Sequence, residues 1–495
     1  MQQATSGTPF TRLLGEWRLG AAPAYRELAD VVRLLILDGR LPLDSALPSE
    51  RTLALALGVS RTTVTAAYNA LREEGFLSAG QGTRARTCIP SQTGAEDPWA
   101  ARTDYAPGLR APEGMVDFAY ACLPANGAAV HQAYTAALSE LPALLPGFGY
   151  DSFGLPELRE AIAAKFTAEG LPTTMDQVMV TGGAQQAMTL ALAAFAAPGQ
   201  RVLVEHPSYP HALDAVSARQ CRAVPLAFPL AGDWDADAFE AALHRHRPAV
   251  AYLIPDFQNP TGRLMPADQR RRVARAAAAS GTVLIADETL RDIDFDGAAP
   301  PHLGSYAPGV VTIGSLSKTH WGGLRIGWAR SSAENIQRMA QSRTSLDLGG
   351  PVAEQLAGRH ILQHDLPGLP ARLTELRTQR DTLLALLEEH LPQWHAEVPQ
   401  GGLSIWCRLP RQGSQGEAVS SAALTLLAAQ RGVRLAAGPR FGVGGAFEHF
   451  LRLPFTLPPH ELERGVLALK DAQRQLLITP GLRRRLPEPP AVAIA

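Results

Sequence analysis

Hydrophobic and polar residues follow a regular alternation over most of the chain. From about Met115 to Leu477, amphipathic helical stretches alternate with short apolar runs. The runs are Val178–Thr181, Arg201–Glu205, Ala249–Ile254, Val283–Ala286 and Val310–Ile313. Such alternation is typical of α/β domains with a mostly parallel sheet, because strands of that kind are buried on both faces. We therefore predict one large α/β domain over residues 115–477.

The N-terminal part predicts two short helices joined by a turn. Ser49 is the expected N-cap of the first helix and Ser60 that of the second, with Gly58 in the turn between them. The second helix has an inward stripe at spacings of four and three residues, made of Val64, Tyr68 and Leu71. The run Phe76–Arg86 predicts a two-stranded wing with a glycine-based turn. We expect a winged helix-turn-helix over residues 24–87.

The start of the second helix favours contact with DNA, because small or forked polar side chains suit the major groove and phosphates. The expected DNA contacts are Ser49, Arg51, Ser60, Arg61, Thr62, Thr63, Thr65, Gly82, Thr83 and Arg84. The plain alternative is a small helical packing domain with a capped surface helix. Residues 1–90 hold ten arginines against eight acidic residues, so one copy should bind weakly and a dimer is expected.

Composition places the chain among ordinary globular proteins. Of its 495 residues 46% are hydrophobic and 19% charged, and the net charge is −1, so no global field points to nucleic acid or membrane. Four distant cysteines without a CxxC pair favour free thiols, and no apolar run is long enough for a membrane span. We expect a cytoplasmic protein with an extension over 1–23, a linker over 88–114 and a disordered tail over 478–495.

Lys318 is the most informative residue, since the chain has only three lysines. It ends the run Gly314–Lys318, rich in small hydroxyl residues, and Arg325 follows seven residues later. An amine in this setting suits a Schiff base to an aldehyde cofactor whose phosphate needs hydroxyls and a guanidinium, which indicates pyridoxal 5'-phosphate. The other two lysines, Lys165 and Lys470, are expected to be solvated.

Further motifs suit the same cofactor. Gly183, Ala184 and Gln185 follow a predicted strand and open a helix, so that their amides can bind a phosphate. Asp287 ends a predicted strand and can face the pyridine nitrogen. Asn259 can reach the ring hydroxyl, with a plain turn as the alternative.

Two residues offer weaker signals for this site. Tyr209 can stack on the ring or simply pack between prolines. Arg452 can form a fork for an incoming carboxylate, and its alternative is an edge-strand surface charge.

Together these motifs resemble a known family. The segment LPSERTLALALGVSRTTVTAAYNALREEGFLSAGQGT resembles the winged-helix domain of GntR-family regulators. The order and spacing of the cofactor motifs resemble the fold-type I aminotransferase domain over roughly 115–477. The joined architecture is similar to the MocR/GabR family of bacterial transcription regulators.

The resemblance implies a role for each motif residue. It implies Lys318 as the Schiff-base lysine, Asp287 at the pyridine nitrogen and Asn259 at the ring hydroxyl. At the phosphate it implies Ser315, Ser317 and Arg325. Arg452 would take a substrate carboxylate, and Tyr150 would enter the phosphate site of the neighbouring subunit, which requires a dimer.

The implied function is that of a regulator that binds operator DNA and senses pyridoxal phosphate or its adduct with an amine or amino acid. The rival interpretations are a working aminotransferase with a DNA-binding-like head and a cofactor-storage protein. Thr289 departs from the family pattern, because regulators of this family commonly carry a tyrosine there. Its hydroxyl offers only a weaker donor, which favours sensing over turnover.

Metal chemistry is not expected. Asp292, Asp294 and Asp296 imitate the start of a calcium loop, but Leu303 stands where a bidentate glutamate belongs. The thirteen histidines show no metal-ligand spacing with cysteines.

Overall fold

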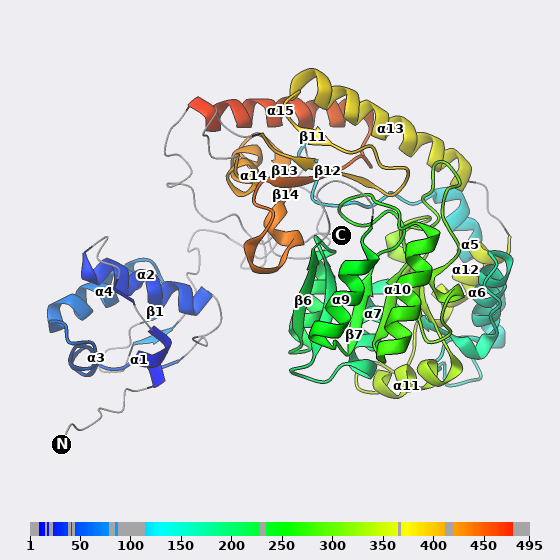
Figure 1. The fold of residues 1–495 in the computed structure, drawn as a ribbon, viewed down its shortest axis with the longest axis horizontal. Helices are drawn as coiled ribbons and strands as arrows, with labels where there is room; N and C mark the ends of the chain where they lie inside the picture. The colour runs from blue at the N-terminus through cyan, green and yellow to red at the C-terminus, as the bar shows by residue number, and fades with distance from the viewer. Residues whose placement is uncertain are drawn as a thin grey trace. The chain divides into compact units, whose positions relative to one another are not determined.

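The computed structural model describes residues 9–14, 17–18, 23–37, 41, 45–78, 85–87, 114–227, 234–364, 368–410 and 419–478. The chain divides into two compact units, Met1–Asp104 and Tyr105–Ala495, called the head and the large domain below. In Figure 1 the head is blue and the large domain runs from cyan to red.

The head is a helix-turn-helix with a short antiparallel strand pair. Its elements are α1 (Pro9–Leu14), α2 (Ala24–Leu37), α3 (Glu50–Leu57), α4 (Arg61–Glu73), β1 (Leu77–Ser78) and β2 (Arg86–Thr87). The predicted caps are confirmed: Ser49 Oγ accepts from the amide of Thr52, and Ser60 Oγ accepts from the amide of Thr63. Gly58 ends α3 at φ +67°, a conformation that favours glycine.

The predicted inward stripe of α4 forms the centre of the head's core, because Val64, Tyr68 and Leu71 are buried. Phe10, Leu14 and Trp17 join the same core from residues that the sequence placed in an extension. The predicted wing residues Gly82, Thr83 and Arg84 lie outside the described residues.

The large domain is built on a seven-stranded sheet of order β4-β10-β9-β8-β7-β5-β6. Its strands are β4 (Val178–Thr181), β5 (Arg201–His206), β6 (Arg222–Ala227), β7 (Val250–Leu253), β8 (Val283–Asp287), β9 (Val311–Ser315) and β10 (Gly327–Arg330). The five strands from β9 to β6 are parallel to one another, and β10 runs antiparallel to both of its neighbours, β9 and β4. The predicted mostly parallel sheet is thus confirmed.

Helices cover both faces of this sheet (Figure 1). They are α7 (Ala184–Phe195), α8 (Pro210–Ala218) and α11 (Ala333–Arg343) on one face, and α9 (Ala236–His246) and α10 (Ala267–Ser280) on the other. Successive residues of each strand point to opposite faces. Tyr252 and Ile285 therefore pack toward α7, whereas Ala251 and Leu284 pack toward α10.

Three helices lie beside the β4 end of the sheet: α5 (Gly127–Glu140), α6 (Pro156–Ala168) and α12 (Val352–Gln363). A smaller lobe follows, with the sheet order β11-β12-β15-β14. Its elements are α13 (Leu369–His390), β11 (His395–Ala396), β12 (Ser404–Arg408), α14 (Ser421–Ala429), β13 (Val433–Arg434), β14 (Ala436–Ala437), β15 (Phe450–Pro454) and α15 (Pro459–Ile478). Because β3 (Val116–Asp117) pairs in parallel with β13, the start of the large domain is tied to this lobe.

Lys165 corrects one expectation. Its ammonium pairs with Glu169 and, at 3.1 Å, with Asp292, so it holds α6 to the loop after β8 instead of being solvated. Asp292 is therefore part of an ion pair, and the described residues include no cluster fit for a metal. Within the same residues, no helix is long and apolar enough to cross a membrane.

Candidate functional site

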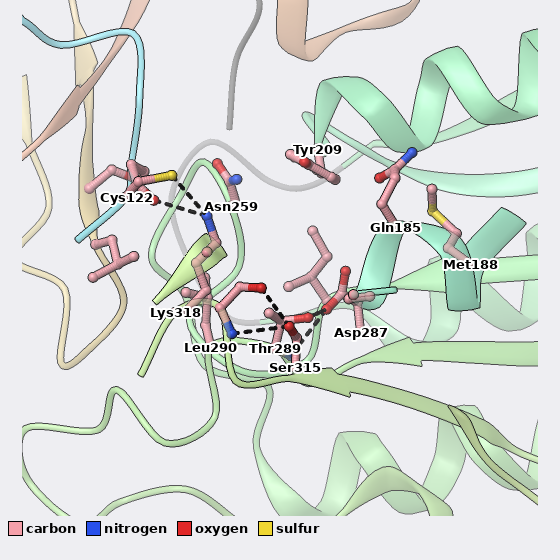
Figure 2. Close-up of a pocket in the computed structure, with 18 of the residues that line it drawn as sticks. Cys122, Gln185, Met188, Tyr209, Asn259, Asp287, Thr289, Leu290, Ser315 and Lys318 are labelled. Carbon is pink, nitrogen blue, oxygen red and sulfur yellow. Dashed lines mark hydrogen bonds between the residues drawn. The ribbon is translucent and has the colours of Figure 1, made fainter. Parts of the chain in front are cut away.

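A pocket of about 190 Å³ lies at the carboxyl ends of β4, β8 and β9. The strands bring their last residues to one edge of the sheet, where binding sites of open α/β sheets form. Eleven of the predicted cofactor residues line it: Gly183, Ala184, Gln185, Tyr209, Asn259, Asp287, Thr289, Ser315, Ser317, Lys318 and Arg325. Figure 2 shows side chains from both lobes of the large domain around this pocket.

One end of the pocket is formed by the N-terminus of α7. The first amides of a helix have no partner within it and attract anions. Arg325, held at φ +52°, donates from Nη2 to the Gly182 carbonyl oxygen. A Cβ on Gly183 would stand 2.8 Å from Arg325 Nη2, and one on Gly327 would stand 2.5 Å from the Gly183 carbonyl carbon. Glycine at both positions keeps this anion cradle open.

Two serines complete this end of the pocket. The Ser315 hydroxyl donates to Ser317 Oγ at 2.8 Å and lies 2.9 Å from the Ile326 carbonyl oxygen. The Ser317 amide donates back to Ser315 Oγ at 3.0 Å. These bonds fix both hydroxyls beside Arg325, where they suit phosphate oxygens.

Asp287 lies on the floor of the pocket with both carboxylate oxygens engaged. Tyr252 donates to Oδ2 at 2.7 Å, while the amide of Thr289 donates to Oδ1 at 3.1 Å and its hydroxyl donates to the same atom. Burial raises the pKa of Asp287, although these bonds and nearby Lys318 favour the ionised form. The Thr289 hydroxyl therefore donates to Asp287. From the sequence, Thr289 was expected only to be a weaker substitute for the usual tyrosine, and this bond was not predicted.

Lys318 reaches across the pocket toward the segment before α5. Its Nζ donates to the Ala121 carbonyl oxygen at 2.9 Å and lies 3.8 Å from Cys122 Sγ (Figure 2). The amine is half-buried and has no carboxylate partner among the described residues. It is therefore held in the pocket without an ion pair that would have to be broken.

Arg452 is fully buried at the centre of β15, between β12 and β14. Its Nη1 lies 3.4 Å from Asn259 Oδ1, its Nη2 donates to the Ala119 carbonyl oxygen, and its Nε has no partner. Burial lowers the pKa of Arg452 to about 10. The alternative of an edge-strand surface charge is wrong. A buried guanidinium without a carboxylate partner in the described chain favours an anionic ligand.

The two predicted tyrosines lie in different places. Tyr209 is the N-cap residue of α8, and burial raises the pKa of its phenol. It lies at the pocket wall, and its ring centroid is 5.3 Å from that of His211 in an edge-on arrangement. Tyr150 stands in the loop before α6 with 73% of its surface exposed, so it does not enter the pocket of its own chain.

Sequence reasoning missed several residues that line this pocket or bond to its lining. Tyr252 lies within an apolar strand, and no motif distinguishes its phenol from core packing. Cys122 and Ala121 come from a segment far from the other motifs. The apolar wall consists of Met188, Ile254, Leu290 and Leu403. None of these residues carries a motif, and the position of Tyr252 on the strand next to that of Asp287 became informative only once β7 and β8 were known to pair.

The candidate DNA surface of the head is polar and exposed. Arg51, Arg61 and Thr62 are exposed, and the Ser60 hydroxyl bonds to those of Thr62 and Thr63 at 2.7 and 2.8 Å. Thr65 differs from the expectation, because it is half-buried and donates to Glu50 at 2.8 Å. It joins α4 to α3 and does not point freely outward.

Two protein-family models match the chain. Residues 147–469 match aminotransferase class I and II, and residues 24–86 match the bacterial regulatory proteins of the gntR family. The chain therefore belongs to the aminotransferase class I and II family and carries a GntR-type helix-turn-helix domain at its N-terminal side. This is the MocR-like architecture that the motifs predicted.

Relatives fall into two groups. The 2-aminoadipate transaminase of Thermus thermophilus is 32% identical over 326 residues, which cover 63% of this chain and 79% of that protein. The HTH-type transcriptional regulator YdcR of Escherichia coli is 27% identical over 460 residues, covering 86% and 94%. The structure of LysN, the α-aminoadipate aminotransferase of Thermus thermophilus, with N-(5'-phosphopyridoxyl)-L-leucine has a TM-score of 0.66 at 30% identity, covering 74% and 93%.

The residues present fit pyridoxal phosphate, the cofactor of this fold. The cradle that a Cβ on Gly183 would fill suits the phosphate, and the half-buried amine of Lys318 suits the aldehyde. Asp287, buried with three donor groups from Tyr252 and Thr289 on its carboxylate, suits a protonated ring nitrogen. Each end of the cofactor thus finds a group of matching chemistry.

Proposed function

We propose that this protein is a transcription regulator that binds operator DNA through its head and senses pyridoxal phosphate, or its adduct with an amine or amino acid, in its large domain. The observation that carries the proposal is the presence, in one chain, of a capped recognition helix and a pocket with Lys318, Asp287 and the Gly183 cradle. Relatives of the same two-domain architecture are described as HTH-type transcriptional regulators.

Pyridoxal phosphate supplies an electrophilic aldehyde and an electron-accepting ring when bound. Arg325, Ser315 and Ser317, with the first amides of α7, hold the phosphate. Asp287 keeps a proton at the ring nitrogen, and Tyr252 and Thr289 hold that carboxylate in place. Asn259 would orient the ring hydroxyl of the cofactor, and Tyr209 would pack against its ring.

Arg452 contacts Asn259 of the pocket lining and gives the protein a binding group for a second ligand, the effector. Its buried guanidinium binds the carboxylate of an amino-acid effector, and its contact with Asn259 couples the effector to the cofactor ring. The apolar wall, which includes Met188 and Leu403, excludes water from the space between the effector and the cofactor.

The proposed dimer rests on an exposed apolar surface of the large domain. Its large side chains are Leu145, Phe148, Tyr150, Leu346 and Leu348, which are 53–96% exposed. The two segments lie together, since a Cβ on Gly349 would stand 2.5 Å from the Asp151 carbonyl oxygen. A second copy covers this surface and receives Tyr150 at its phosphate site. We place this dimer in the cytoplasm.

Regulation requires that the effector binds two states of the dimer with different affinity. The decisive experiment is to sequence DNA that co-purifies with the protein, with and without pyridoxal phosphate. A defined operator whose occupancy changes with the cofactor is expected. Full-length dimer that prefers no sequence over random DNA at moderate salt would refute the regulator.

The rival function, a working aminotransferase, is favoured by the complete cofactor set and by the relationship to a transaminase. The two functions separate in a single-turnover experiment with a panel of amino acids. A regulator converts bound cofactor slowly, whereas rates on the order of 1 per second or more indicate an enzyme.

A further inference from the structure

A second concentration of cationic groups lies at the opposite end of the sheet from the cofactor pocket. Arg201 and Arg222 are the first residues of β5 and β6, and Arg247 is the C-cap of α9, just before β7. These three arginines line a hollow of about 320 Å³, together with Gly199, Gln200 and Ala249. Asp287 and Ser315 stand at the other ends of their strands, so the arginine hollow is no part of the cofactor site.

The arrangement is electrostatically unfavourable by itself. Arg201 and Arg222 are directly opposite each other in the register of β5 and β6, where like charges repel. All three arginines are exposed, and none forms an ion pair within the described part of the chain. The lining of the hollow includes no acidic residue. Arg201 donates to the His246 carbonyl oxygen at 3.1 Å, so all three charges are without an anionic partner among the described residues.

The cationic surface continues on the adjacent helices. Arg247 also lines a neighbouring hollow of about 740 Å³ with Arg275. The one acidic residue there, Glu240, is already paired with Arg272 at 3.0 Å. Arg247 lies at the C-terminal end of α9 and Arg222 at the start of the edge strand β6, two elements labelled in Figure 1, and both side chains are exposed. Charges spread over an exposed surface suit a line of phosphates better than one enclosed ion.

We propose that Arg201, Arg222 and Arg247 bind backbone phosphates of the DNA to which the protein attaches. This inference rests on the proposed binding of operator DNA. Arginine forks bind phosphate oxygens in pairs, and such contacts add affinity without reading sequence. The head has a surplus of only two positive charges over residues 1–90, so phosphate contacts from the large domain supply attraction that the head lacks.

The test compares two triple variants of the full-length protein. The first is Arg201→Gln/Arg222→Gln/Arg247→Gln. The control, Arg408→Gln/Arg464→Gln/Arg474→Gln, removes the same charge from exposed arginines of β12 and α15. Affinity for operator and for random duplex is measured by fluorescence anisotropy between about 50 and 200 mM salt, a range over which phosphate contacts weaken strongly.

The expected result is a shallower slope of log affinity against log salt for the first variant, by about 0.9 per lost contact and about 1–3 in total. The control keeps the wild-type slope. The ratio of operator to random affinity stays unchanged in both, since phosphate contacts carry no sequence information. An unchanged slope in the first variant, or an equal loss in the control, overturns the inference.

Two further measurements distinguish DNA from a small phosphate ligand and from a loss of folding. If the wild type prefers no DNA sequence, the proposed function is refuted. The salt slopes measured on random duplex still show whether the three arginines contact phosphates. Inorganic pyrophosphate is added to the wild type and to the first variant, and Tm is measured. If pyrophosphate raises the Tm of the wild type but not of the variant, and the salt slopes of DNA binding are the same in both proteins, the arginines form a site for a small phosphate compound. That result overturns the DNA assignment. The first variant should melt at or above the wild-type Tm, because repulsion is relieved. If the first variant melts below the wild type, the single variant Arg222→Gln is used in its place, because Arg222 has no side-chain hydrogen bond among the described residues. Arg222→Gln must then make the slope of log affinity against log salt shallower by about 1.

Discussion

In the head, the predicted DNA contacts that the structure describes come from one short stretch, Ser49–Thr65, and most of them are exposed. In the large domain, the pocket gathers residues that are spread from Ala121 to Ser404 and buries several of them completely. The head therefore presents local chemistry on a small scaffold. The large domain creates a site that exists only when distant strands align.

The contrast teaches where each region is vulnerable. A surface contact such as Arg61 can be removed without leaving a buried group unpaired, so its loss costs affinity and little else. A buried carboxylate such as Asp287 depends on Tyr252 and Thr289, and any change among them alters its pKa. Substitutions on the surface of the head should therefore change affinity and leave stability unchanged, whereas substitutions in the buried pocket should change both.

The largest expected effect comes from Lys318→Ala. The variant should retain no cofactor that borohydride can fix to the chain, because no other amine lines the pocket in the described residues. Its unfolding free energy should stay within about 0.5 kcal/mol of wild type. Peptide mapping after borohydride treatment measures the attachment. Lys470→Ala, at an exposed lysine of α15, is the control, and label found on Lys165 or Lys470 would disprove the assignment.

Gly183→Ala should come next. The new Cβ would displace Arg325, whose charged hydrogen bonds to phosphate are worth about 1.5–3 kcal/mol, so cofactor affinity should fall roughly 10- to 100-fold. Gly281→Ala is the control for a positive-φ glycine in open space, at φ +71° and ψ +15°. Gly183, at φ +99° and ψ +168°, lies in a backbone region that is essentially restricted to glycine, so Gly183→Ala should lose about 1–3 kcal/mol of stability and Gly281→Ala about 1 kcal/mol. Cofactor titration by fluorescence distinguishes them, and equal affinity in the two variants would contradict the cradle.

Arg61→Ala tests the head. It should weaken operator binding and relax the preference at one base pair by about 1–3 kcal/mol if Arg61 reads a base. Cofactor binding by the large domain should not change. Arg18→Ala, in the head but outside the helix-turn-helix, is the charge-matched control, and binding to a panel of single-base operator variants is the measurement. Uniform weakening across that panel would reduce Arg61 to a phosphate contact.

Thr289→Tyr tests the departure from the family pattern. The phenol should move the pH midpoint of the cofactor's absorbance and raise the rate at which amino acids convert bound cofactor to its amine form. Losing the hydroxyl that donates to Asp287, and crowding the wall, should cost about 1–3 kcal/mol of stability. Stopped-flow spectroscopy measures the rate. Fast conversion by the wild type itself would show that Thr289 is no impediment.

The smallest effect is expected from pH, and it should affect only the large domain, because the first 130 residues contain no histidine. His302 is buried between Glu169 and Glu288; burial lowers its pKa, but the bonds to these carboxylates outweigh burial and raise it overall. Its stabilising contribution is complete below about pH 6.5 and is lost as pH rises through the raised pKa.

Thermal unfolding at several pH values measures this contribution. As pH rises through the raised pKa of His302, the Tm of the wild-type large domain should fall by on the order of 2 °C. The Tm of the His302→Gln variant should not fall over the same pH range. The melting of the head should be indifferent to pH in both proteins. A parallel fall of Tm in the variant would locate the titrating group elsewhere.

Much of the fold was predictable because local rules decide it. The caps at Ser49 and Ser60 satisfy amides within the next three residues, and the stripe of α4 repeats at helical spacing. Of the five predicted runs, Val178–Thr181 matches β4 and the other four differ from their strands by one or two residues at an end, for example Val250–Leu253 within the predicted Ala249–Ile254. The strands β6 and β10 were not among the predicted runs. Thr65 escaped prediction, because its partner Glu50 lies fifteen residues away on another helix.

The sequence by itself determined which chemistry is present: one lysine in a setting of hydroxyls, one aspartate at a strand end, and a helix-turn-helix with polar residues at its recognition helix. Such features depend on neighbours in the chain, where spacing and residue type carry the information. Only the tertiary structure decided that Tyr252 holds Asp287, that Arg452 is buried beside Asn259, and that two arginines confront each other across β5 and β6. Contacts of this kind depend on the order and register of the strands, which local sequence does not specify.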